Sequence, residues 1–513
     1  MTTQKEFGDF QTPAILAKEV IALVSSLFGS PDLVVEPTAG LGSFLEAANT
    51  EWGGAAKYEG YEVNPAYVLK ASARLAGKDV LLKEQNFFGA NWEAILGANP
   101  EAKLLVVGNP PWVTNSALGS LGSANLPDKT NFQGLRGFDA KTGKANFDIA
   151  EWMLIRLFET LPSHGAMAML CKSITARKVL LHFWKTIDGV ADAKLFSIDA
   201  KNHFGVSVDA CLFYVSACPS KQKTAKVYPT LSTKECVTEF GIMDGRLVSN
   251  IRGYVSHKDI DGGSPYLWRS GIKHDAAMVM ELTPENGHYR NGYGEMVIVE
   301  NAHVYPLLKS SDIANNRIEP RHFVLVTQTK TGDATHLICD TAPKTWQYLE
   351  CHANVLDARK SSIYKNRPRF CLFGIGDYSF ALWKVAISGL YKSLQFVAVP
   401  PVQGRPVMLD DTCYFIPCNS EREARLFCDL LNSPACQEFL KSLVFLDSKR
   451  PVTTEVLRRI SLRAIAARLG RLQEFEAVFA ATGYSASEAE GQLYLVMEDR
   501  KEYKTGSKQG RSK

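Results

Sequence analysis

Short β-like runs alternate with helical patterns through the first part of the chain. The runs lie at residues 33–35, 58–62, 104–107, 166–170 and 211–215. Helical patterns separate most of them, for example at residues 14–27 and 149–161. This alternation is typical of strands joined by crossover helices in a doubly wound α/β sheet. We therefore expect an α/β domain over residues 1–220.

The pattern changes after residue 220. Charged, turn-rich stretches alternate there with β-like pieces such as residues 322–326, and helical patterns return near residues 421–431 and 455–469. We expect a second, mixed α+β domain over residues 221–470. A helical extension and a basic tail are expected over residues 471–513, because lysines and arginines dominate its end and such ends are usually solvated.

Composition excludes several classes of protein. No apolar run approaches the roughly 18–20 residues that span a membrane, and the N-terminus lacks the apolar core of a signal peptide, so we expect a cytoplasmic protein. The 11 cysteines form no C-x-x-C pair and no histidines have zinc-site spacing, so we expect neither a metal site nor a disulfide framework. The net charge of +4 is too small to indicate nucleic-acid binding by itself.

A strand, a glycine turn and a helix start follow one another at residues 33–44. The turn contains Glu36, Pro37, Thr38, Gly40 and Gly42. Glycines at the carboxyl end of a strand let the backbone approach a ligand closely, although such turns also occur without a ligand.

An acidic residue, Glu62, ends the next strand twenty-two positions after Gly40, where a carboxylate can accept hydrogen bonds from ribose hydroxyls. A nicotinamide dinucleotide fits poorly, because Leu45 occupies the third glycine position of its motif, and no Lys-Ser/Thr ending marks a P-loop. An adenosine ligand without phosphates fits better. Asn86 could bond an adenine edge while Phe87 or Phe88 covers its face; a loop asparagine beside core phenylalanines is the alternative.

The fourth strand runs into Asn109-Pro110-Pro111-Trp112. The two prolines remove two backbone donors and stiffen the turn. The Pro110 carbonyl and the Asn109 side-chain oxygen then offer two acceptors, which suit the two hydrogens of an –NH₂ group. Trp112 offers a flat surface on which a planar base can stack.

With these motifs, residues 1–220 resemble the amino-methyltransferases of restriction-modification systems in the γ arrangement, with cofactor motif first, catalytic motif second and target-recognition domain last. The resemblance implies a Rossmann-like, S-adenosylmethionine-dependent catalytic domain. Residues 7–13 resemble the N-terminal motif, whose threonine, here Thr12, helps to hold the methionine carboxylate. Glu62 matches the ribose acid and residues 109–112 match the catalytic motif. The family usually has Asp where Asn86 stands, which makes that contact less certain.

Two further features extend the resemblance. Phe204 stands where the family has a second aromatic residue before a later strand, with a core phenylalanine as the alternative. Residues 268–275, 374–392 and 447–451 resemble the recognition domains of restriction-associated adenine methyltransferases.

A basic run within residues 359–369 holds no acidic residue and interleaves cations with Tyr364, which suits a phosphate backbone. A solvated surface is the alternative. The candidate DNA-binding residues are Arg359, Lys360, Lys365, Arg367 and Arg369, with Lys449 and Arg450 as a second group.

The resemblance implies methylation of the N6 amino group of an adenine flipped out of double-stranded DNA. Trp112 and Phe204 would sandwich the base, while Asn109 and the Pro110 carbonyl orient its amino group toward the sulfonium methyl. The polar residues 113–146 are expected to fold over the DNA. No nuclease constellation is present in the chain, so any cleavage is assigned to a separate restriction endonuclease, and we expect a monomer.

Three alternatives remain at this point. Cytosine-N4 methyltransferases more often have Ser before the two prolines, so Asn109 favours adenine. Protein glutamine methyltransferases share the Asn-Pro-Pro turn but lack a large C-terminal domain that resembles a DNA reader. A non-catalytic DNA-binding protein would have no need to keep Thr12, Glu36, Gly40, Glu62 and Asn109.

Overall fold

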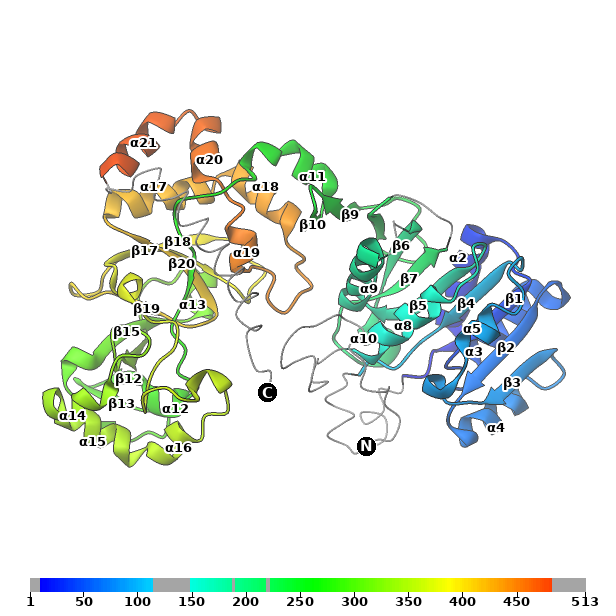
Figure 1. Ribbon diagram of the computed structural model, residues 1–513, viewed down its shortest axis with the longest axis horizontal. Coiled ribbons are helices and arrows are strands. Elements are labelled where there is room, and N and C mark those ends of the chain that lie inside the picture. Colours follow the sequence, from blue (N-terminus) through cyan, green and yellow to red (C-terminus); the bar gives the residue numbers. More distant parts are fainter. Residues whose placement is uncertain (1–9, 114–147, 187–189, 218–221, 482–513) are drawn as a thin grey trace, which may run out of the picture. The chain divides into compact units, whose positions relative to one another are not determined.

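The computed structural model describes residues 10–113, 148–186, 190–217 and 222–481. The chain divides into two compact units, Met1–Ile251 and Arg252–Lys513 (Figure 1). Within the described ranges, no helix combines the length and the apolar composition that crossing a membrane requires. The residues before Phe10, the segment between Val113 and Asp148, and the basic tail lie outside the described residues, so those three expectations stay predictions.

The first unit is built on one large sheet. Its strands are β1 (Leu33–Glu36), β2 (Lys57–Glu62), β3 (Val80–Glu84), β4 (Leu104–Gly108), β5 (Ala166–Lys172), β6 (Ala191–Ile198), β7 (Ala210–Ser216), β8 (Thr224–Tyr228), β9 (Thr238–Met243) and β10 (Arg246–Val248). The helical elements are α2 (Ala14–Phe28), α3 (Ser43–Trp52), α4 (Pro65–Arg74), α5 (Trp92–Leu96), α8 (Ile149–Glu159), α9 (Ser173–Thr186) and α10 (Ala200–Phe204), with the 3-10 turns η1 (Gly53–Ala55) and η2 (Phe87–Gly89).

The strand order is β10-β9-β8-β6-β7-β5-β4-β1-β2-β3. Strands β3, β2, β1, β4 and β5 are parallel, and β7 is inserted antiparallel between β5 and β6. The chain runs outward from β1 to β2 and β3, then returns to the other side of β1 as β4. That reversal makes the carboxyl ends of β1 and β4 a topological switch point, where ligands of such sheets bind. The expected Rossmann-like α/β class is confirmed.

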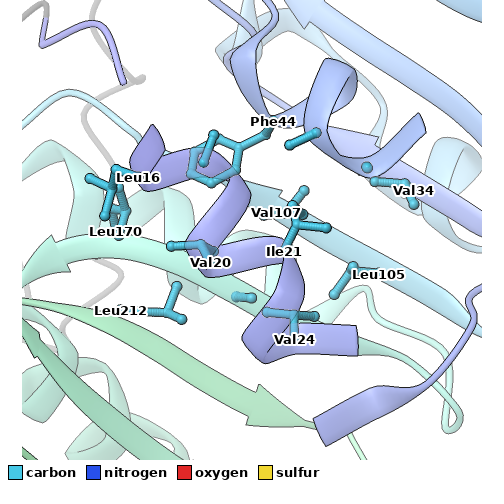
Figure 2. Close-up of a cluster of buried hydrophobic side chains, with 14 of the residues drawn as sticks. Leu16, Val20, Ile21, Val24, Val34, Phe44, Leu105, Val107, Leu170 and Leu212 are labelled. Carbon is cyan, nitrogen blue, oxygen red and sulfur yellow. The ribbon is translucent and has the colours of Figure 1, made fainter. Parts of the chain in front are cut away.

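Helix α2 covers one face of this sheet with an apolar stripe. Leu16, Val20 and Val24 recur at every fourth position, which places them on one side of the helix. Figure 2 shows this stripe against Leu105 and Val107 of β4, with Leu170 and Leu212 beside it. All of these side chains are buried. The packing anchors the strands whose ends carry the candidate motifs.

The first unit ends later than the sequence predicts. The predicted boundary is residue 220, whereas the compact unit continues to Ile251. The reason is strand pairing: β8 lies parallel to β6, and β9 and β10 extend the sheet further. Tyr228 of β8 stacks on Phe196 of β6 with ring centroids 4.5 Å apart. The change of sequence pattern after residue 220 therefore marks further strands of the same sheet, of which β8 is parallel to β6 and β9 and β10 are antiparallel to their neighbours.

The second unit contains two smaller sheets. Their strands are β11 (Arg269–Ser270), β12 (Glu281–Glu285), β13 (His288–Arg290), β14 (Met296–Val297), β15 (Val304–Leu308), β16 (His322–Leu325), β17 (Trp383–Ser388), β18 (Phe396–Val399), β19 (Met408–Leu409) and β20 (Cys413–Cys418). The orders are β11-β20-β17-β18 and β14-β13-β12-β16-β15-β19. The mixed class that the sequence predicts for this part is what the structure shows.

Helices accompany both sheets. They are α11 (Ile251–Ser256), α12 (Ala277–Met280), α13 (Ser310–Ala314), α14 (Ile338–Thr341), α15 (Pro343–Cys351), α16 (Ala353–Asp357), α17 (Glu421–Leu431), α18 (Pro434–Leu443), α19 (Thr454–Leu457), α20 (Leu462–Arg468) and α21 (Leu472–Ala481), with the 3-10 turns η3 (Lys258–Ile260), η4 (Asn301–His303), η5 (Thr335–Leu337), η6 (Ser362–Tyr364) and η7 (Asp377–Phe380). Helix α17 packs on β17 and β18, and α21 packs on α17 and α20. The start of the predicted extension after residue 470 is thus part of this unit.

The late boundary generates a prediction about fragments. Removal of β8, β9 and β10 would make β6 the edge strand of the sheet, with the side that now pairs with β8 left open. An open edge of this kind favours aggregation. A fragment of residues 1–251 should therefore show one cooperative thermal transition, whereas a fragment of residues 1–220 should melt at a lower temperature or aggregate. Circular dichroism and size-exclusion chromatography measure both properties. Equal melting temperatures for two monomeric fragments would show that β8 to β10 do not stabilise the sheet.

Candidate active site

The glycine turn between β1 and α3 has the conformation that its sequence predicts. Gly40 and Gly42 have φ angles of 52° and 75°, in the left-handed region that favours glycine. A Cβ atom on Gly40 would also lie 2.6 Å from Gln11 Oε1. That oxygen accepts a hydrogen bond from the Leu41 amide at 3.0 Å, so the N-terminal segment packs directly on the turn.

Glu62 lies at the carboxyl end of β2 and faces the same turn. Its Oε2 accepts a hydrogen bond from the Gly40 amide at 2.8 Å, and its Oε1 accepts one from the Asn64 amide at 2.8 Å. The residue is only 8% exposed. A carboxylate has about four lone-pair sites, so Glu62 can hold the turn and still accept hydrogen bonds from a ligand. The structure thus brings Glu62 to the glycine turn, as the sequence predicts.

Glu36 has a different environment from the one expected of a cofactor ligand. It is 2% exposed, and its Oε2 accepts a hydrogen bond from the Leu45 amide in the first turn of α3 at 3.3 Å. Burial raises the pKa of the Glu36 carboxyl well above its usual range; the Leu45 amide opposes this effect and the nearby Glu62 charge adds to it. Glu36 therefore supports the start of α3 beneath the turn formed by Pro37, Thr38 and Gly40.

Asn109 joins the turn of residues 109–112, the predicted catalytic turn, to the N-terminal segment. Its Nδ2 donates to the Phe10 carbonyl at 2.8 Å and to Thr12 Oγ1 at 3.3 Å. The Thr12 carbonyl in turn accepts a hydrogen bond from Ser43 Oγ at 2.8 Å, and Thr38 Oγ1 donates to the Asn109 carbonyl at 3.4 Å. Three segments far apart in the sequence therefore meet at the ends of β1 and β4.

The side-chain oxygen of Asn109 has no hydrogen-bond partner among the described residues, although it is buried. The two acceptors that Nδ2 contacts set the orientation of the amide, which leaves Oδ1 as an acceptor beside Pro110. Leaving a buried acceptor unsatisfied is costly. The site thus suits a ligand that donates a hydrogen bond at this point, as an amino group does.

Three aromatic rings surround the catalytic turn. The ring centroids of Trp112 and Phe204 are 5.2 Å apart at an interplanar angle of 72°, and Phe10 lies 5.7 Å from Trp112 and 6.0 Å from Phe204. Trp112 is 6% exposed, and its Nε1 donates to the Leu170 carbonyl at 3.3 Å.

These contacts show the rings packed on each other, and the predicted sandwich stays a prediction. A base stacked between two rings needs parallel planes with a gap between them, whereas Trp112 and Phe204 touch edge to face. The rings would have to separate before a base could enter. The sequence prediction also missed Phe10, whose only signal was its place within the N-terminal motif.

The region after β3 supports the alternative interpretation of Asn86. Its Oδ1 accepts a hydrogen bond from the Phe88 amide at 2.9 Å and so caps η2. Phe87 is buried against Trp92, with centroids 4.7 Å apart, while the half-buried Phe88 packs on Trp152 of α8 at 5.4 Å. Phe88 and Trp152 are therefore the more accessible aromatic surfaces here, and the sequence analysis did not single out Trp152.

The cations of the basic run, residues 359–369, differ in their contacts: some bond other parts of the protein and the others make no ion pair among the described residues. Arg359 is internal: its guanidinium donates to the carbonyls of Leu356, His274 and Cys371 and stacks on Tyr364 at 3.9 Å. Arg369 forms a forked ion pair with Asp357, with Nη2 2.8 Å from Oδ2.

The other cations of the two candidate groups are exposed, as Arg369 is. Among the described residues, the side chains of Lys360, Lys365, Arg367 and Lys449 make no ion pair, and Arg450 Nη2 lies 3.8 Å from Asp411 Oδ2. The prediction that the five cations of the run face DNA is not tested by the structure, which shows that Arg359 bonds backbone carbonyls and that Arg369 forms a surface ion pair with Asp357. Within the described ranges, no cluster of His, Cys, Asp or Glu could hold a metal ion.

Comparison with known proteins gives one sequence relative and several structural ones, whereas no protein-family model matches the chain. The chain is 42% identical over 475 residues to the Type II methyltransferase M.NspV of Nostoc sp. (strain ATCC 29411 / PCC 7524), which covers 90% of this chain and 98% of that protein.

Among solved structures, the Type IIL restriction-modification enzyme MmeI, in complex with DNA, has a TM-score of 0.52 at 14% identity. That match covers 86% of this chain but only 63% of MmeI, so it shows a shared fold alone. The match to the type IIG restriction endonuclease BpuSI covers 88% of this chain and 58% of BpuSI at a TM-score of 0.37 and 14% identity.

Two lines of evidence agree. The fold has its turns at the switch point of the sheet, and 42% sequence identity to M.NspV extends over 90% of the chain. Together they show that the chain belongs to the Type II DNA methyltransferases of restriction-modification systems, enzymes that take their methyl group from S-adenosylmethionine.

Proposed function

We propose that this protein methylates the N6 amino group of adenine at a specific site in double-stranded DNA. The observation that carries the proposal is the buried Oδ1 of Asn109 at the switch point of the sheet, which has no hydrogen-bond partner in the part of the chain that the structure describes. Beside it, the Pro110 carbonyl supplies a second acceptor. Two acceptors on a stiff turn match the two hydrogens of an exocyclic amino group.

The glycine turn and its neighbours fit S-adenosylmethionine, which supplies an activated methyl group when bound. Glu62 would accept hydrogen bonds from the ribose, since its carboxylate faces the turn at Gly40. Thr12 would hold the methionine carboxylate, because Asn109 and Ser43 fix it beside the turn. Phe88 and Trp152 would offer the adenine an aromatic surface near Asn86 and Phe87.

In methyl transfer the main task of the protein would be to position the amino nitrogen against the methyl donor. Asn109 and the Pro110 carbonyl would accept the two amino hydrogens and so direct the nitrogen lone pair toward the methyl donor. No side chain needs to act as a nucleophile. Correct alignment of two reactants can account for about 7–11 kcal/mol of a reaction barrier.

The adenine must leave the duplex before it can reach these acceptors, at a cost of a few kcal/mol. Trp112 and Phe204 would offset this cost, since one base–aromatic stack is worth roughly 1–3 kcal/mol. Their edge-to-face contact implies that the incoming base displaces one ring from the other. Replacing a ring–ring contact by ring–base contacts lowers the net gain of stacking.

The second unit is proposed as the target-recognition domain. Lys360, Lys365, Arg367 and Lys449 are exposed cations that could contact phosphates without breaking an internal ion pair. Phosphate contacts set the register of a protein on DNA, and base contacts add the specificity. We further propose that the chain is a monomeric modification component whose cognate restriction endonuclease is a separate protein.

The direct test is to incubate the purified protein with S-adenosylmethionine and DNA, and to identify the modified nucleoside by mass spectrometry. N6-methyladenine supports the proposal. N4-methylcytosine, which the same turn could make, would overturn the choice of base, and an unmodified DNA with a methylated protein glutamine would overturn the choice of substrate. Sequencing of the modified DNA then gives the recognition site.

The cofactor assignment predicts the effect of Glu62→Ala. Loss of the carboxylate should weaken S-adenosylmethionine binding by about 1–3 kcal/mol, because the ribose hydrogen bonds and the support of Gly40 are lost. Isothermal titration calorimetry measures the affinity. Glu59→Ala is the matched control on the same strand, since Glu59 bonds Tyr61 and Lys83 instead of the turn. Equal affinities for the two variants would contradict the role of Glu62.

The catalytic assignment predicts that Asn109→Ala lowers kcat roughly a hundredfold or more, as loss of a transition-state hydrogen bond does elsewhere. Single-turnover kinetics on DNA measure the chemical step. The same variant should melt cooperatively, and calorimetry should show that cofactor binding survives the change. A wild-type rate of transfer by Asn109→Ala would exclude the amide from the reaction.

The two kinds of cation predict different mutant behaviour. Changing Lys360, Lys365 and Arg367 to Gln should weaken DNA binding and flatten its salt dependence by up to about one unit of log–log slope per lost phosphate contact. Arg369→Gln should leave that slope unchanged and cost at most about 1 kcal/mol of stability, since it breaks a surface pair with Asp357. DNA titrations across a salt series measure the slopes. Parallel slopes for the triple variant and wild type would assign the DNA contact to another surface.

A further inference from the structure

A lysine outside the predicted motifs contacts the catalytic turn. Lys172 is the last residue of β5, which pairs with β4 in parallel register through Gly108 and Met169. Its Nζ donates to the Trp112 carbonyl at 3.0 Å and to Asp148 Oδ2 at 2.8 Å. One ammonium group therefore joins the end of the catalytic turn to the start of α8.

Asp148 uses its two carboxylate oxygens for two different contacts. Its Oδ1 accepts a hydrogen bond from the Ala150 amide at 3.1 Å and so caps α8, while Oδ2 takes the lysine. Next to it, the Ile149 amide donates to the Val113 carbonyl at 2.9 Å. The chain leaving the turn and the chain entering α8 are thus tied by one backbone bond and one ammonium bridge.

The turn needs such an external support because of its own sequence. Pro110 and Pro111 have no amide hydrogen, so they cannot donate hydrogen bonds that would fix the turn from within. β5 supplies what is missing: the Leu170 carbonyl holds the indole Nε1 of Trp112, and Lys172 holds the Trp112 carbonyl. Trp112 is therefore fixed both through its side chain and through its backbone.

We propose that Lys172 is a positioning residue for methyl transfer, which it serves by holding Trp112 and Asp148 so that Asn109 and the Pro110 carbonyl keep their places. The inference rests on the proposed function of the turn. A displacement of about 1 Å at reacting groups can cost about a hundredfold in rate. A lysine with three donors on a flexible stem can satisfy a carbonyl and a carboxylate at once.

The test compares Lys172→Met with a matched control. Methionine keeps an unbranched apolar chain of similar length but removes the ammonium group. The control is Lys178→Met: Lys178 Nζ lies 3.1 Å from Glu151 Oε2, in an ion pair that joins α9 to α8 one helical turn beyond Asp148. Both changes remove a lysine bound to a buried acid of α8, but the Lys172 bridge also contacts the catalytic turn.

Lys172→Met should lower kcat at least about tenfold, with a smaller loss of affinity for S-adenosylmethionine, because Glu62 and Thr12 make no contact with Lys172 and only the N-cap of α8, not Trp152, is bound by it. Lys172→Arg should recover part of the rate by restoring the charge and the donors. Lys178→Met should reduce the melting temperature to a similar degree and leave kcat within about twofold of wild type. Asp148→Asn, which can still cap α8, should have an intermediate effect.

A second measurement does not depend on catalysis. Hydrogen exchange with mass spectrometry should show faster exchange for peptides that contain Ile149 in Lys172→Met, and no such change in Lys178→Met. Wild-type kcat together with unchanged exchange in Lys172→Met would overturn the inference, as would losses equal to those of Lys178→Met. A wild-type enzyme that methylates another base, or none, would overturn the proposed function, while the exchange comparison would still decide the role of Lys172.

Discussion

The site depends on the parallel pairing of β1 with both β2 and β4. Because these strands are parallel, their carboxyl ends lie at one edge of the sheet, and the turns that follow them meet there. The glycine turn comes from β1, Glu62 from β2 and Asn109 from β4. Helix α2 buries its apolar stripe on the strands behind this edge, so the relative positions of the three motifs depend on the core.

Hydrogen bonds across this edge connect the proposed cofactor residues to the proposed catalytic turn. Asn109 donates to Phe10 and Thr12, and Ser43 of α3 donates to the Thr12 carbonyl. The donor group of Asn109 thus serves the structure, while its acceptor stays unpartnered among the described residues. The same amide side chain thus holds the N-terminal segment through Nδ2 and leaves Oδ1 to accept a hydrogen bond from a ligand. A serine hydroxyl has one donor hydrogen and an alanine has none, so neither could make both of the hydrogen bonds that Nδ2 donates.

The aromatic residues show how the site balances order against access. Phe10, Trp112 and Phe204 pack on one another, which buries apolar surface that would otherwise face water. A flipped base would exchange these contacts for its own. Lys172 and Leu170 hold Trp112 from the side of β5 by hydrogen bonds, which the phenyl rings of Phe10 and Phe204 cannot form. Under the proposed function, the cost of separating the rings would be part of the cost of admitting the base.

The sequence by itself determined the α/β class, the two turns and the acid at the end of β2, because each depends on local patterns: strand periodicity, glycines with positive φ, and prolines without donors. The tertiary structure alone decided which residues of those patterns have partners. Arg359 and Arg369 belong to a basic run in the sequence. In the fold, however, Arg359 donates hydrogen bonds to backbone carbonyls and Arg369 pairs with Asp357. Tyr228 lies in a turn-rich stretch, yet its stacking on Phe196 places it in the first unit. Phe10, Trp152 and Lys172 gain their roles from neighbours far along the chain, and spacing within a motif carries no information about contacts of that range.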